Sequence, residues 1–208
     1  MSTLQKIAYY QNRRDEVPNQ QLARELAQMR DEQGIREIAE NLYNKNKNVQ
    51  SDCLKVLYEI GYINPELITG YTGDFLKLLK SKNNRMIWGA MIGLATVARL
   101  RADEIWTQVD EVIAAVEHGT LITVVWGVKT LAAVATTRSE YRVKILPFLM
   151  NILNTCIPRD VTMHAESILP AIDPGNREEF LSILERRKEE LKPAQQARLK
   201  KVIKKMKT

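Results

Sequence analysis

A pattern of apolar residues that recurs about every 37 positions is the feature that most limits how this chain can fold. Its first column holds four leucines, Leu57, Leu94, Leu131 and Leu169, which stand 37, 37 and 38 residues apart. A second apolar column follows three residues later, at Ile60, Val97, Val134 and Ile172. Small residues stand four positions before the leucines, at Cys53, Ala90, Gly127 and Ala165. A large side chain with a small one a turn earlier suits close packing between helices, so the pattern predicts stacked helices.

Each repeat also contains a second apolar segment. Its columns are Phe75, Val112 and Leu149, then Leu79, Val116 and Leu153. One period earlier the pattern continues with Ile35, Ile38 and Leu42. Spacings of three and four residues are typical of amphipathic helices, and no stretch alternates between apolar and polar residues as a half-buried strand does. The sequence therefore predicts an all-α chain built from helix pairs.

The predicted helices add up to about five pairs. We expect a short helix at residues 3–12 and an N-terminal pair at residues 18–30 and 32–44. About four further pairs follow within residues 48–191, and a tail helix covers residues 194–206. Helix pairs that repeat and stack on one another form an α-solenoid. At this period the chain resembles HEAT-repeat proteins, of the HEAT/armadillo-like class. The resemblance implies an α-α superhelix of stacked antiparallel helix pairs.

Positive charge is concentrated at the C-terminal end of the chain. The formal net charge is +6, and residues 177–208 hold 11 Lys and Arg against 5 Asp and Glu. Residues 1–176 hold 20 of each and are neutral. A groove for nucleic acid needs positive charge along the domain, because neutralisation of phosphates supplies most of the non-specific affinity. Nucleic acid is therefore not the favoured partner.

The residues after Pro193 form an amphipathic segment. Leu199, Val202 and Met206 make an apolar stripe. The other side carries the lysines of the basic tail, which are Lys200, Lys201, Lys204, Lys205 and Lys207. A solenoid needs a helix with one polar side at its end, so residues 193–208 are expected to cap a repeat domain that spans residues 1–192. The alternative is that the tail binds an acidic partner, nucleic acid or an anionic membrane surface.

Neither a targeting segment nor a membrane span is evident. The first 14 residues include polar Gln5, Lys6, Gln11 and Asn12, where a signal peptide needs an apolar core. The uncharged run Met86–Ala98 has 13 residues, fewer than the ~20 that cross a bilayer. Two cysteines and two histidines lack the paired spacing of a zinc site. We expect a cytoplasmic protein without membrane insertion, metal or cofactor.

The outward face of the first helix in each repeat changes character along the chain. In the first full repeat this face is charged, whereas the next two repeats place Ile92 and Trp126 there. Two interpretations stay open: neighbouring helices or loops cover this apolar middle, or it is a patch for self-association or a partner. In the second case Trp126 would be its anchor, because tryptophan is enriched at the energetic centres of interfaces.

Trp106 and Asp110 stand one turn apart, on the second helix of one repeat and towards its inner, concave side. The arrangement resembles the Trp-x-x-x-Asp of alkylpurine DNA glycosylases built from HEAT-like repeats. That resemblance implies a catalytic Asp110 beside a cavity wall formed by Trp106. The nearby residues Glu104, Glu111 and Glu117 are acidic, however, and would repel DNA. The plainer interpretation is a partly buried tryptophan and an acid that favours the helix dipole.

We therefore predict a non-enzymatic scaffold that binds another macromolecule, a protein, through the concave face of its second helices. The candidate contact residues are Trp106, Asp110, Glu117, Trp126 and Ile92. The alternatives are the glycosylase that uses Asp110, and an adaptor that binds nucleic acid or membranes through the basic tail.

Overall fold

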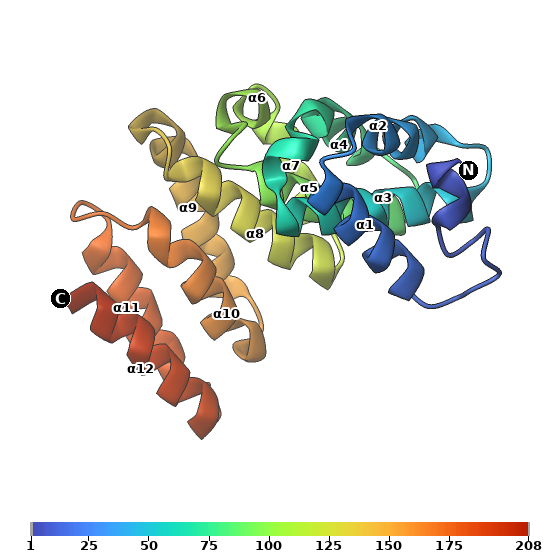
Figure 1. Cartoon of the computed structure of the whole chain (residues 1–208). Coiled ribbons are helices and arrows are strands. Elements are labelled where there is room, and N and C mark those ends of the chain that lie inside the picture. Colours follow the sequence, from blue (N-terminus) through green and yellow to red (C-terminus); the bar gives the residue numbers. More distant parts are fainter. Residues whose placement is uncertain (1, 208) are drawn as a thin grey trace. The chain divides into compact units, whose positions relative to one another are not determined.

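The computed structural model describes residues 2–207, and within that range the regular structure is entirely helical (Figure 1). The side chain of Lys207 lies outside the described part. The chain forms two compact units, residues 1–130 and 131–208, which divide inside one helix. None of the helices within residues 2–207 is long and apolar enough to cross a bilayer.

The first unit contains seven complete α-helices and the start of an eighth among its described residues. They are α1 (Val17–Met29), α2 (Glu32–Glu40), α3 (Lys47–Ile63), α4 (Thr72–Leu78), α5 (Asn84–Val97), α6 (Ala102–Trp106), α7 (Val109–Glu117) and α8 (Leu121–Ala135). Short 3-10 helices cover Thr3–Lys6, Asn41–Tyr43 and Pro65–Tyr71. The predicted N-terminal pair is thus confirmed, whereas the segment predicted near 3–12 is helical only over its first residues.

First and second helices of the first unit form separate layers, as the repeat pattern predicts. The first helices α1, α3 and α5 pack side by side, and α4 packs against α5 and α6 (Figure 1). Side-chain caps fix where the helices begin: Asn46 accepts a hydrogen bond from the backbone of Asn48, and Asn83 from that of Arg85. The leucine column lies in the core, with Leu57 and Leu94 fully buried.

The last repeat keeps the 37-residue period more strictly than the sequence alignment proposed. Ile168 and Ala171 are fully buried, whereas Leu169 and Ile172 are only half-buried. The helix ends at Ile168, and the chain continues as a 3-10 turn. Ile168, which stands 37 residues after Leu131, therefore takes the core position of this repeat. The expected spacing of 38 is therefore wrong by one residue.

The second helix of the repeat that holds Trp106 and Asp110 is broken into α6 and α7, which corrects the placement of these two residues. Trp106 ends α6 and Asp110 lies in the first turn of α7. Between them the Thr107 hydroxyl donates to the carbonyl of Glu104 at 2.7 Å, a local bond that competes with the helix ladder. The two residues are close in sequence but do not share one helix.

The second unit contains the end of α8 and four further α-helices. They are α9 (Ser139–Thr155), α10 (Pro158–Ile168), α11 (Arg177–Lys188) and α12 (Pro193–Lys207), with a 3-10 helix at Leu169–Ala171. The tail helix α12 packs against α10 and α11 and buries the predicted stripe of Leu199, Val202 and Met206.

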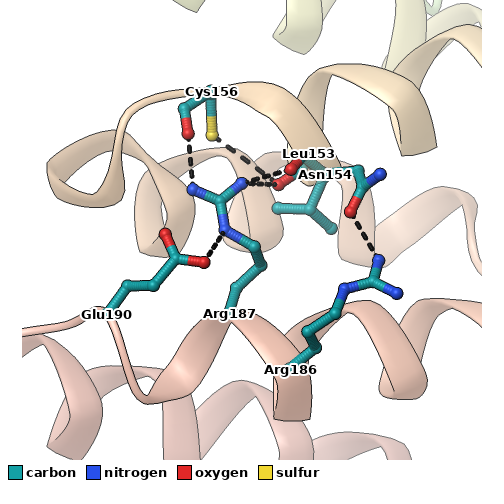
Figure 2. A network of polar contacts seen from close by, with 6 residues as sticks. All are labelled: Leu153, Asn154, Cys156, Arg186, Arg187 and Glu190. Carbon is teal, nitrogen blue, oxygen red and sulfur yellow. Dashed lines mark hydrogen bonds and ion pairs between the residues drawn. The ribbon is translucent and has the colours of Figure 1, made fainter.

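A buried arginine fixes the end of α9 to α11 (Figure 2). The Arg187 guanidinium is 5% exposed and donates to the carbonyls of Leu153 (3.0 Å), Asn154 (2.6 Å) and Cys156 (2.5 Å). Its Nε also donates to Glu190 at 2.9 Å. Carbonyls at a helix C-terminus lack intrahelical hydrogen-bond donors and carry partial negative charge. A buried guanidinium supplies the missing donors and is attracted to this charge.

Replacing Gly127 tests the close packing of the small-residue column. A Cβ at this position would overlap Val116 Cγ2. The Gly127→Ala variant gains about 1 kcal/mol of helix propensity but loses about 1–3 kcal/mol to overpacking, so we expect a net loss of stability. Gly73→Ala is the matched control, because its Cβ would lie 3.6 Å from Glu104. Urea unfolding should show destabilisation for Gly127→Ala alone; equal stabilisation of both variants would contradict this packing.

Replacing Arg187 tests the clamp on α9. Arg187→Ala leaves three carbonyls and Glu190 without their donor, and we expect the free energy of unfolding to fall by about 3–5 kcal/mol. The neighbouring Arg186 is exposed and donates to Asn154 Oδ1, so Arg186→Ala should cost less than about 1 kcal/mol. Denaturant curves measure both. Similar values for the two variants would show that the buried bonds contribute little.

Candidate functional site

The surface of α6 and α7 is strongly acidic. Over residues 102–117 these two helices carry five carboxylates and no Lys or Arg. We call this surface the acidic face; it consists of Asp103, Glu104, Asp110, Glu111 and Glu117, together with Trp106. Four of the acids are exposed, and Glu104 and Trp106 are half-buried. The face therefore unites three predicted contact residues on the second helices of the first unit.

An apolar stripe determines which way the acidic face points. Ile105 and Val112 are fully buried, and Val109 and Val116 are nearly so. Because these side chains occupy the core side of α6 and α7, the residues between them face solvent. Asp110 and Glu117 are exposed for this reason.

Some of the acids form ion pairs with cations from flanking segments. Arg101 Nε lies 3.4 Å from Glu104 Oε2, and Lys80 Nζ lies 3.1 Å from Glu111 Oε1. These four side chains keep 38–59% of their surface exposed, so each pair contributes little stability. The arrangement suits a partner with several positive charges.

A column of carboxylates at one repeat position was missed by the sequence analysis. Glu37, Asp74 and Glu111 stand 37 residues apart. Glu37 accepts from the backbone of Thr3 at 3.0 Å, and Asp74 accepts from the Tyr43 hydroxyl at 2.9 Å. Burial, and then this hydrogen bond, raise the pKa of Tyr43 to about 12, so its hydroxyl keeps its proton and remains a donor. Each carboxylate of the column contacts a segment that precedes it in the chain.

The geometry does not favour a glycosylase active site at Asp110. An aspartate that stabilises a positively charged sugar needs a sheltered pocket, but Asp110 is exposed on a helix surface. Cavities of about 460, 380 and 260 Å³ in the structure are lined by side chains other than Asp110 and Trp106. The carboxylates of the acidic face would also repel the phosphates of DNA.

The first-helix surface around Trp126 is covered by aromatic contacts. The Trp126 ring lies 5.8 Å from that of Tyr62, and the Lys129 ammonium lies 3.9 Å from the Trp126 ring centre. Burial lowers the pKa of Lys129. Ile92 is 5% exposed, so it is inaccessible to a partner, and the expectation that it forms a contact patch is wrong. Trp126 is half-buried and keeps part of its surface exposed.

The basic tail exposes its lysines on the side of α12 opposite the buried stripe. These residues are Lys200, Lys201, Lys204 and Lys205. Lys207 belongs to the helix, but its side chain is not among those described. The tail therefore combines a packing surface with a cationic one.

Comparisons with known sequences give no family assignment: no family model and no curated protein matches the chain. Solved structures do match. A designed armadillo repeat protein in complex with the peptide (KR)4 has 14% sequence identity and a TM-score of 0.70, with 98% of each chain covered. An engineered protein gives 16% identity and a TM-score of 0.67, covering 100% of this chain and 97% of the other.

A natural protein with a similar fold is the karyopherin Kap121p, in its structure bound to the SUMO protease Ulp1p. It shares 14% identity at a TM-score of 0.64, and the match covers 96% of this chain but 22% of the karyopherin. At these identities the likeness establishes the fold, and it agrees with the helix pairs and their 37-residue period. The chain is an α-solenoid with the HEAT/armadillo-like repeat fold.

Proposed function

We propose that this chain is a non-enzymatic scaffold that binds a basic segment of a partner protein on the acidic face. The observation that carries the proposal is the charge of α6 and α7, where five carboxylates stand with no cation on either helix beside a half-buried tryptophan. Stacked helix pairs present extended surfaces that suit chain-like ligands. The solved armadillo neighbour in complex with the (KR)4 peptide supports a basic ligand.

The residues of the acidic face have different roles in this proposal. Trp106 offers a ring on which a Lys or Arg side chain can lie, a contact in which the cation is attracted to the aromatic face. Asp110 and Glu117 are exposed, and their negative charges add to the attraction that a cationic partner experiences before contact. Electrostatic attraction of this kind mainly speeds association and selects partners by charge.

A location in the cytoplasm belongs to the same proposal. Cys53 and Cys156 are both free thiols. Cys53 is buried, and burial raises its thiol pKa to about 12, which keeps it protonated and unreactive. Free thiols are typical of a reducing compartment.

The peptide (KR)4, carrying a fluorescent label, tests the acidic face directly. The double variant Asp110→Asn/Glu117→Gln removes two exposed negative charges, and we expect about tenfold weaker binding in an anisotropy titration, equivalent to roughly 1.4 kcal/mol. Glu178→Gln/Glu189→Gln is the matched control, because it removes two exposed charges from the second unit. Raising the salt to about 1 M should weaken binding as the Debye length falls to ~3 Å.

The same variants discriminate against the other functions. If alkylated DNA releases bases in the presence of the chain and Asp110→Asn abolishes this release, the glycosylase interpretation replaces the scaffold. Equal loss of peptide binding in both double variants would show a non-specific charge effect and would contradict a site on α6 and α7.

The exposed lysines of α12 favour a second candidate, an adaptor for polyanions. We expect the quadruple Lys→Gln variant at positions 200, 201, 204 and 205 to weaken binding of single-stranded nucleic acid if the tail is such a site, with a smaller salt slope. The substitution keeps the buried stripe of α12, so it tests charge separately from folding. Unchanged binding in this variant would exclude the tail as the polyanion site.

A further inference from the structure

A cavity of about 460 Å³ lies in the first unit, away from the acidic face. Its walls come from the N-terminal segment 8–19, the first half of α3 and the first turns of α5. Binding sites for small molecules have volumes of ~300–1,000 Å³, so this cavity is large enough for one such ligand.

Specific contacts hold the N-terminal segment over α3 and so shape the cavity. Asp52 of α3 accepts hydrogen bonds from the backbone of Tyr9 at 2.8 Å and from the side chain of Asn19 at 2.9 Å. Lys55 of α3 lies 2.7 Å from Glu16. The cavity thus joins residues that are 30 or more positions apart in the sequence.

The charged side chains that line the cavity sum to +1, and two of its arginines form no ion pair within the described part of the chain. Asp15 pairs with Arg13 at 2.8 and 2.9 Å and Glu16 pairs with Lys55, whereas Asp52 accepts hydrogen bonds from uncharged N–H groups and keeps its negative charge. Arg14 and Arg85 also line the cavity, and neither forms an ion pair with a carboxylate of residues 2–207. Two guanidinium groups at a cavity of net positive charge suit an anionic ligand group, and arginine binds phosphate oxygens with paired hydrogen bonds.

The remaining wall is aromatic. Trp88 of α5 is half-buried, and its ring centre lies 6.5 Å from that of the buried Tyr58 on α3. A half-buried indole that lines the same cavity as the arginines gives a planar ring a surface to lie on. The cavity therefore combines cationic groups that suit a phosphate with an aromatic surface for a flat group.

We infer that this cavity binds a small phosphate-bearing molecule with a planar ring, of the nucleoside monophosphate class. Its phosphate contacts Arg14 and Arg85, and its ring lies against Trp88. The size of the cavity favours a small molecule over a protein segment, and the pair of guanidinium groups favours a phosphate over a single carboxylate. This site is separate from the acidic face and does not depend on the function proposed for that face.

Calorimetric titration of the full chain with adenosine monophosphate tests the inference. We expect saturable binding that is at least about tenfold weaker in Arg14→Ala/Arg85→Ala, since each lost charged hydrogen bond costs roughly 1.5 kcal/mol or more. The matched control is Arg24→Ala/Arg36→Ala, which removes two exposed arginines of the same unit that do not line the cavity. Trp88→Phe, which keeps an aromatic ring but reduces its area, should weaken the nucleotide but leave inorganic phosphate unchanged.

Three results would overturn the inference. They are no binding by the unmodified chain at millimolar nucleotide, equal weakening in both double arginine variants, and tighter binding of a phosphorylated peptide than of the nucleotide. The last result would assign the arginines to a macromolecular partner. Circular dichroism on each variant confirms that the fold is retained, as expected for exposed arginines with no carboxylate partner in the described chain.

Discussion

Burial of the leucine column between two layers of helices is the interaction on which the rest of the structure depends. One helix pair cannot cover its own apolar side, so each repeat is stable only when a neighbour packs on it. Leu57 and Leu94 lie fully buried in successive first helices, and the small residues before them let the next helix approach. Gly127 shows how tight this approach is, because a single added carbon would overlap Val116. Because the repeated core residues determine the packing, the residues on the outward surfaces can differ from one repeat to the next.

The sequence predicts the parts of the fold that depend on this local period. Helix pairs, their order and the buried columns as far as Leu131 and Val134 follow from spacings of three, four and 37 residues, and the structure confirms them. The break between Trp106 and Asp110 could not be predicted in this way, since the pattern of Ile105, Val109 and Val112 continues through it while the Thr107 hydroxyl diverts one carbonyl. The register of Ile168 was missed because Leu169 offers an equally apolar side chain one position later.

The candidate sites likewise include features that a local sequence pattern predicts and features that depend on contacts between distant residues. The exposure of Asp110 and Glu117 is predictable because a helical stripe shows from sequence alone which residues face solvent. The burial of Ile92 was missed because it depends on packing between helices, which a local pattern does not reveal. The cavity beside Trp88 depends in the same way on the bond between Tyr9 and Asp52.

Neutrality of residues 1–176 conceals a separation of charge that only the fold reveals. The 20 acids and 20 cations of this stretch cancel in a sum. Even so, α6 and α7 carry five acids without a cation, while the charged side chains that line the cavity beside Arg14 and Arg85 sum to +1. Electrostatic attraction falls off over about 10 Å at 0.1 M salt, so a ligand responds to the charge of one face and not to the total. A neutral repeat domain can therefore offer an anionic face to one partner and a cationic cavity to another.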